Sequence, residues 1–137
     1  METDEVASWD QLDLKDNLLR GVYGYGFENP SPIQKKAIKP IMTGKDVIAQ
    51  AQSGTGKTGA FTISTIQRID ETLNEIQGLI LAPTRELAIQ IHSVASTMGT
   101  FVENLSCSLL IGGRSIDLDV KENQHKNNQT NGFRRSR

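Results

Sequence analysis

Residues 51–58 read Ala-Gln-Ser-Gly-Thr-Gly-Lys-Thr, and they join a short apolar run at 46–51 to a helix-like pattern that begins at Lys57. Glycine tolerates backbone conformations that bring consecutive N–H groups together on phosphate oxygens, which is the role expected of Gly54 and Gly56. The N-terminus of the following helix adds free amides and a favourable dipole for an anion. This strand–loop–helix setting predicts a phosphate-binding loop for a nucleoside triphosphate.

Two residues of this loop are expected to carry the chemistry. The Lys57 ammonium would reach the β and γ phosphates, and the Thr58 hydroxyl would ligate a Mg²⁺ ion that arrives with the nucleotide. The usual pattern opens with Gly where this chain has Ala51, so a chance match in a flexible loop is the alternative interpretation. The other loop residues expected at the phosphates are Gln52, Ser53, Gly54, Thr55 and Gly56.

The sequence on either side of the loop predicts an α/β fold. Apolar runs at 46–51, 78–82 and 106–111 have the length of buried strands, and helix-like stretches of ten or more residues separate them. Strands joined by such helices imply right-handed crossovers and a parallel sheet flanked by helices. We therefore expect the first portion of a doubly wound domain.

Capping residues indicate where the helices should begin. Asp13 is placed to cap a first helix, and Ser31 with Pro32 directly after it predicts the start of a second. A third helix is expected from Lys57, and Thr84 can cap a fourth.

Length, charge and cysteine content narrow the class of protein. The chain has 137 residues and a net charge of −1, so it fits one domain and has no overall field that would recruit nucleic acid. The single cysteine, Cys107, lies in an apolar run and is expected to be a buried structural thiol. The sequence has neither an apolar stretch of about 18 residues nor a leader pattern, so we expect a cytoplasmic or nuclear protein with no membrane partner.

Composition divides the chain into three expected parts. Residues 1–8 are short and acidic, and a flexible N-terminus is predicted there. Residues 9–120 carry the helical and strand patterns of the domain. Residues 121–137 are rich in Asn and Gln with an excess of Lys and Arg, which predicts a disordered polar and basic tail.

Three segments together resemble successive motifs of the DEAD-box RNA helicases. Residues 26–34 read Gly-Phe-Glu-Asn-Pro-Ser-Pro-Ile-Gln, 51–58 form the phosphate loop, and 83–90 read Pro-Thr-Arg-Glu-Leu-Ala-Ile-Gln. In that family the loop normally opens with Ala, which removes the doubt about Ala51. The resemblance covers about residues 8–115. It implies a partial RecA-like domain with ATP and Mg²⁺ as cofactors and RNA as a sequence-independent partner.

The resemblance implies that Phe27, Asn29 and Gln34 contact the nucleotide. An amide presents a donor beside an acceptor, so Gln34 can pair with adenine and reject guanine. The pair Ser31 and Gln34 also forms a capping box, and both roles are compatible because the cap would hold the glutamine near the nucleotide. Phe27 can offer its ring to adenine, and ordinary burial of the ring is the alternative. Trp9 is expected to anchor this segment by packing.

Two further segments are expected to line an RNA path. Free amides at a helix start, together with an arginine, suit an RNA phosphate, and paired glycines permit close approach of the RNA backbone. The alternative is simple N-capping with surface charge. His92 falls on the polar side of its helix pattern and is assigned no role. The resemblance assigns RNA binding to Pro83, Thr84, Arg85, Glu86, Gly112 and Gly113.

The acidic motif of the family is not found in these residues. ATP hydrolysis needs carboxylates to hold the Mg²⁺ shell and to orient the attacking water, and the sequence contains neither Asp-Glu-Ala-Asp nor Ser-Ala-Thr. The resemblance implies an ATP-dependent RNA helicase of the translation-initiation branch. Without the acidic motif, this chain alone is not expected to hydrolyse ATP. The alternative is an inert module that binds nucleotide, RNA or a translation-initiation scaffold protein. Without further strands, apolar edges at 47–48 and 79–81 are expected to be partly unpaired.

Overall fold

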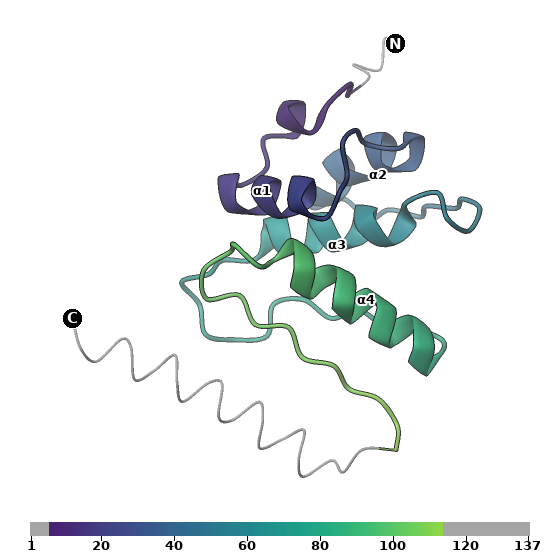
Figure 1. The fold of residues 1–137 in the computed structure, drawn as a ribbon, viewed down its shortest axis with the longest axis vertical. Helices are drawn as coiled ribbons and strands as arrows, with labels where there is room; N and C mark the ends of the chain where they lie inside the picture. The colour runs from purple at the N-terminus through teal and green to yellow at the C-terminus, as the bar shows by residue number, and fades with distance from the viewer. Residues whose placement is uncertain (1–5, 114–137) are drawn as a thin grey trace, which may run out of the picture.

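Four α-helices and one 3₁₀ helix form the packed layer of residues 6–113. The computed structural model describes residues 6–113, in which η1 (Trp9–Leu12), α1 (Asp16–Gly24), α2 (Pro32–Met42), α3 (Lys57–Arg68) and α4 (Arg85–Met98) follow in that order. Helix α3 is central, with α2 and α4 packed against it on opposite sides, and α1 contacts both α3 and α4 (Figure 1).

The core lies where these helices meet. Trp9 from η1, Leu18 from α1, Ile38 from α2, Ile63 from α3 and Met98 from α4 are all fully buried. Burying an aliphatic side chain of this size contributes roughly 1.5–3 kcal/mol. Because each element contributes at least one such side chain, the helices stabilise one another around a single shared core.

Three of the predicted helix starts are confirmed. Helix α2 begins at Pro32 with Ser31 as its N-cap, and α3 begins at Lys57. Thr84 caps α4, where its Oγ1 accepts a hydrogen bond of 3.2 Å from the Leu87 N–H. The cap at Thr84 could be predicted locally, because its side chain needs only the first turn of its own helix.

The predicted cap at Asp13 is wrong. Helix α1 begins at Asp16, with Lys15 at its N-cap position, and Asp13 instead closes η1 with a φ of 52°. The 3₁₀ turn buries Trp9 and Leu12, and the chain must then reverse before α1. Aspartate is one of the few residues that adopts this left-handed conformation readily, so Asp13 serves the turn rather than the helix.

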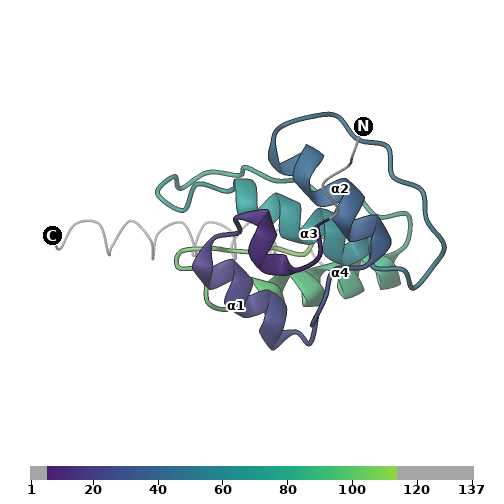
Figure 2. The same ribbon diagram turned by 90° about the horizontal axis from the view of Figure 1, so that it is seen from above.

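The predicted parallel sheet is not formed among residues 6–113. The segments 46–51, 78–82 and 106–111 are extended, but none is assigned as a strand. Strands must lie about 4.8 Å apart to exchange hydrogen bonds. The segments 78–82 and 106–111 face each other across a cavity, and 46–51 arches away from the helices (Figure 2).

The apolar edges predicted at 47–48 and 79–81 are confirmed as exposed. Ile48 is fully accessible to solvent, and Leu79 and Leu81 are 78% and 84% exposed. Their sequence has the apolar character of buried strands, but no neighbour in the described residues covers them.

The N-terminal segment joins the core where it is described. Val6 is buried, and the Ala7 N–H donates a hydrogen bond of 2.6 Å to Gln11 Oε1. Residues 1–5 and 114–137 lie outside the described residues, so the flexible terminus and the tail at 121–137 remain predictions. Between residues 6 and 113, no helix combines the length and apolar character needed to cross a bilayer.

Candidate functional site

The loop at 51–58 has the backbone that a phosphate cradle requires. Gly54 and Gly56 have φ values of +78° and +97°, which only glycine adopts without strain. Gly56 is also the N-cap residue of α3, so the free amides of the first helical turn open onto the loop. The Thr55 hydroxyl donates a hydrogen bond of 2.6 Å to the Gln52 carbonyl and braces the turn.

Lys57 lies over the loop rather than in solvent. Its ammonium donates a hydrogen bond of 2.5 Å to the carbonyl oxygen of Ala51, six residues earlier. The lysine therefore spans the loop from its last residues to its first. Thr58 follows within the first turn of α3 and is half-buried, whereas Gln52 and Ser53 are exposed at the tip.

Gln34 connects α2 to the loop at 51–58. Its side chain is only 2% exposed; Oε1 accepts a hydrogen bond of 2.9 Å from the Ser31 N–H, and Nε2 donates one of 3.1 Å to the Gly56 carbonyl. An amide has two N–H groups and two acceptor sites, so these two bonds use one of each and leave one of each unused. The glutamine thus completes its predicted contact with Ser31 and also holds the loop.

Phe27 is placed beside Gln34 by an aromatic cluster. Its ring stacks on Trp9 with 6.0 Å between centroids, and Tyr25 meets its edge at 4.9 Å. Gly59 in α3 gives room for this arrangement, because a methyl group there would lie 2.7 Å from Phe27 Cε2 and 2.8 Å from Gln34 Nε2. The predicted packing role of Trp9 is confirmed by its complete burial.

Asn29 is exposed at the start of the turn that leads to α2. The structure gives its side chain no described contact with the loop. The residues of the nucleotide prediction that it does bring together are Phe27, Gln34, Gly56, Lys57 and Thr58, which come from two helices and the turn before each.

The two segments predicted for RNA meet at Arg85. A methyl group added at Gly113 would lie 3.2 Å from Arg85 Nη2, and one added at Gly112 would lie 3.9 Å from the same atom. Gly113 has a φ of +88°, so glycine is needed there for the backbone as well as for space. Pro83, Thr84, Arg85 and Glu86 are exposed around the N-terminus of α4.

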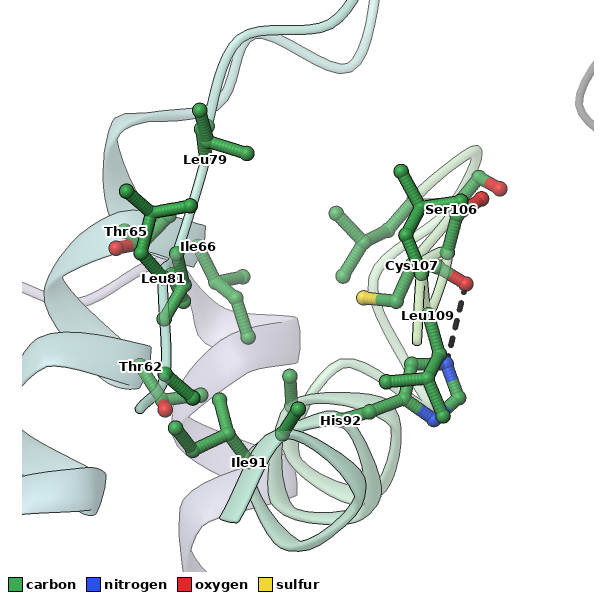
Figure 3. A pocket seen from close by; sticks show the side chains of 18 of the residues that line it. Thr62, Thr65, Ile66, Leu79, Leu81, Ile91, His92, Ser106, Cys107 and Leu109 are labelled. Carbon is green, nitrogen blue, oxygen red and sulfur yellow. Dashed lines mark hydrogen bonds between the residues drawn. The ribbon is translucent and has the colours of Figure 1, made fainter. Parts of the chain in front are cut away.

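His92 makes a contact that its sequence pattern did not predict. Its side chain is half-buried, and Nε2 lies 3.3 Å from the Cys107 carbonyl oxygen, so it ties α4 to the following extended segment (Figure 3). The prediction that His92 has no role did not foresee this contact, because Cys107 lies 15 positions further along the chain. Cys107 is half-buried rather than fully buried. One sequence signal could have indicated this contact: His92 directly follows Ile91, which lies on the buried face of α4.

Comparison with known protein families assigns the chain to one of them. The family model described as DEAD/DEAH box helicase matches residues 31–131, which is most of the chain. The chain belongs to the DEAD/DEAH box helicase family.

Within the described part of the chain, no three His, Cys, Asp or Glu side chains gather as a metal site.

Curated members of the helicase family resemble the chain closely. The ATP-dependent RNA helicase eIF4A of Yarrowia lipolytica is 56% identical over 116 residues, and that of Aspergillus niger is 58% identical over 118 residues. The ATP-dependent RNA helicase FAL1 of Mycosarcoma maydis is 55% identical over 117 residues. Each match covers 85% of this chain but only 29% of the relative, so the chain spans less than a third of their length.

Solved structures of the helicase family share the fold. A DEAD box protein from Methanococcus jannaschii matches with a TM-score of 0.78 and 35% identity, over 84% of this chain and 31% of that one. Prp28 from Chaetomium thermophilum, bound to ADP, matches with a TM-score of 0.72 and 36% identity, over 82% and 28%. S. cerevisiae Dbp5, bound to RNA and ADP BeF3, matches with a TM-score of 0.71 and 35% identity, over 80% and 29%.

Proposed function

We propose that this chain binds ATP at the loop 51–58 and RNA along 83–86 and 112–113, as the first portion of an ATP-dependent RNA helicase that acts in translation initiation. Relatives named ATP-dependent RNA helicase eIF4A support the assignment to this branch. The observation that carries the proposal is the hydrogen bond from Gln34 to the loop at Gly56. It connects the proposed adenine reader to the proposed phosphate cradle.

Adenine recognition would use the unoccupied half of the Gln34 amide. One N–H and one acceptor site remain after the bonds to Ser31 and Gly56. Adenine offers a donor at N6 beside an acceptor at N7, which matches an amide, whereas guanine offers two acceptors on the same edge. The aromatic cluster around Phe27 supplies an apolar surface beside this edge.

Phosphate binding would draw Lys57 away from its intramolecular partner. The ammonium now bonds the Ala51 carbonyl, and a phosphate oxygen carries more negative charge than a carbonyl oxygen. Thr58 in the first turn of α3 is the residue that would hold Mg²⁺ together with the nucleotide phosphates. The positive φ values of Gly54 and Gly56 fit this cradle, since they turn backbone amides toward one point.

RNA binding would use the cation at Arg85 and the glycines beside it. The guanidinium lies against Gly112 and Gly113, and the free amides of α4 begin next to it. Such a surface contacts phosphate and sugar rather than bases, so binding would be independent of sequence. We place this activity in the cytoplasm, with the nucleus as the alternative.

For the isolated chain we propose binding without turnover. The sequence supplies the loop lysine and threonine but no Asp-Glu-Ala-Asp segment to orient the attacking water. The second candidate function is therefore an inert module that binds nucleotide, RNA or a translation-initiation scaffold. Purified chain should show no Mg²⁺-dependent ATPase above background. Turnover that Lys57→Ala abolishes would contradict this proposal.

The deciding experiment is a titration of the purified chain with ATP and GTP. We expect ATP to bind about tenfold more tightly, which corresponds to about 1.4 kcal/mol. Gln34→Ala should remove the preference for ATP, whereas Gln90→Ala on the exposed face of α4 should leave it unchanged. Equal affinity for both nucleotides in the unmodified chain would exclude adenine reading.

The same titration separates two roles of Gln34. If the glutamine only supports the loop at Gly56, Gln34→Ala should weaken ATP and GTP equally. If it also reads adenine, ATP should lose more affinity than GTP. Lys57→Ala should weaken both nucleotides, because it removes a contact to phosphates that they share.

A further inference from the structure

Phe27 lies in the turn that follows α1, and hydrogen bonds fix its backbone there. Tyr25 is the C-cap residue of α1, and Gly26 follows it with a φ of +100°. The Gly26 N–H donates a hydrogen bond of 3.0 Å to the Tyr23 carbonyl. The Phe27 N–H donates one of 3.3 Å to the Val22 carbonyl. This pair of bonds is a Schellman motif, so the backbone of Phe27 is held while its side chain depends on its neighbours.

Two aromatic rings pack on the side chain of Phe27 from different depths. Trp9 is fully buried, Phe27 is half-buried, and Tyr25 is 39% exposed. The planes of Trp9 and Phe27 differ by only 18°, whereas those of Tyr25 and Phe27 differ by 68°. Stacked and edge-to-face ring pairs both attract beyond the area they bury. Trp9 therefore holds the Phe27 ring from the core, and Tyr25 holds it from the exposed side.

Helix α3 bounds the Phe27 ring on a further side. A methyl group at Gly59 would lie 2.7 Å from Phe27 Cε2 and 2.8 Å from Gln34 Nε2. The ring thus lies against the first turn of α3, next to the glutamine that bonds the loop at 51–58. Because Trp9 and α3 bound the ring on its inner sides, Tyr25 is the residue placed to oppose its rotation toward solvent.

The Trp9 ring depends on packing for its own position. Its Nε1 is buried and makes no hydrogen bond within the described structure. A hydrogen bond would fix the orientation of an indole, and without one the ring is held by its contacts alone. Trp9 is also the single tryptophan of the chain, so its fluorescence reports on the contact with Phe27.

We propose that Tyr25 is a positioning residue of the nucleotide site: its ring holds Phe27 in the orientation that stacks on the base. This inference rests on the proposed function, because it requires a nucleotide base beside Phe27. Tyr25 acts through Phe27 and needs no contact with the nucleotide. The role belongs to the ring rather than to the hydroxyl, so phenylalanine should replace the tyrosine.

Acrylamide quenching of Trp9 fluorescence, in the purified full chain without nucleotide, tests the positioning directly. With excitation that tyrosine does not absorb, Tyr25→Ala should raise the quenching constant about twofold, because Phe27 can then turn outward and uncover Trp9. Tyr25→Phe should keep the value of the unmodified chain. Ile89→Ala is the matched control, since Ile89 is 44% exposed but belongs to α4 rather than to the turn at 25–27.

Titration with ATP and GTP tests the consequence for the site. Tyr25→Ala should weaken both nucleotides by the same factor, about fivefold, because an aromatic ring stacks on either purine. The ratio of the two affinities should therefore stay as in the unmodified chain, whereas Gln34→Ala should change it. Tyr25→Phe should bind both nucleotides as the unmodified chain does.

The two measurements together separate the competing explanations. Unchanged quenching in Tyr25→Ala would overturn the proposal, and weaker nucleotide binding alongside it would indicate direct contact between Tyr25 and the nucleotide. Raised quenching with unchanged affinities, or equal losses in Tyr25→Phe and Tyr25→Ala, would overturn it as well. If the unmodified chain binds neither nucleotide, the proposed function fails, whereas quenching still decides whether Tyr25 holds Phe27. Circular dichroism checks that each variant keeps its helices, as substitution of a side chain this exposed should allow.

Discussion

The helical layer and the extended segments contain similar apolar residues and differ in how those residues are covered. Ile63 in α3 is fully buried, whereas Ile48 in the segment after α2 is fully exposed and Leu81 is 84% exposed. A helix satisfies its backbone hydrogen bonds within itself and needs neighbours only for one face. A strand needs neighbours for both its backbone and its side chains, so it depends on contacts far away in the sequence.

This difference has a consequence for solution behaviour. Apolar residues in the extended segments remain available to other molecules, and unpaired extended chain favours aggregation. We therefore expect a domain of marginal stability with a tendency to associate. A cooperative melt typical of an ordinary mesophilic domain, at about 45–65 °C, would count against this expectation.

The largest effect should come from a paired truncation across the two regions. Ile63→Ala should cost about 3–4 kcal/mol, because it leaves a cavity in the core between the helices. Leu81→Ala should change the free energy of unfolding by less than about 0.5 kcal/mol, since its side chain is largely exposed. Urea unfolding followed by circular dichroism measures both, and equal losses would remove the distinction between the two regions.

A second prediction tests how closely the helices approach. Gly21 in α1 faces α4, and a methyl group there would lie 1.8 Å from the Met98 carbonyl oxygen, which belongs to the backbone. Gly21→Ala should cost about 3 kcal/mol or prevent folding, because one helix must move. Gly24→Ala on the same helix is the control, since its nearest contact would be 3.8 Å from Phe101. Similar melting temperatures for both variants would contradict this packing.

A third prediction connects the helical layer to the proposed nucleotide site. Gly59→Ala would place a methyl group against Phe27 and Gln34, whose side chains can shift more easily than backbone. Stability should fall by only about 1 kcal/mol, whereas the preference for ATP over GTP should decrease. Titration of both nucleotides checks this, again with Gly24→Ala for comparison. Unchanged selectivity would show that the position of Gln34 does not decide it.

The smallest effect concerns the ion pair that links the two regions. Lys15, before α1, donates a hydrogen bond of 2.7 Å to Glu71 in the connection after α3, and this bond lowers the pKa of the Glu71 carboxyl from its ordinary 4.5. A lowered folded pKa means that the stabilisation is present above 4.5 and is lost as the pH falls through the folded value. Because both side chains are partly exposed, the contribution should be below about 1 kcal/mol.

Unfolding measured at neutral pH and in acid tests this pair. Glu71→Gln should be slightly less stable than the unmodified chain at neutral pH, and the two should converge in acid. Glu75→Gln, at an exposed position of the same connection, should show no such convergence. A constant difference at all pH values would exclude the ion pair as its cause.

Much of the site was predictable from the sequence because its signals are local. Gly54 and Gly56 were expected to shape the loop, and both have positive φ. Thr84 was expected as a cap, and its hydroxyl bonds the first turn of α4. The bond from Gln34 to Gly56 was not predicted, because these residues are 22 positions apart and no local rule relates them. The predicted cap at Asp13 was wrong, because Asp13 closes η1 in the left-handed conformation instead.

The sequence by itself determined three of the helix starts, the turn of the loop at 51–58 and the apolar character of the extended segments, because each depends on residues within a turn or two of one another. The tertiary structure decided which side chains meet: Gln34 with the loop, Arg85 with the glycines at 112–113, and His92 with the segment after α4. It also decided that the segments 78–82 and 105–110 stand apart on either side of a cavity. Strand pairing is a contact between distant segments, so apolar sequence alone cannot specify it.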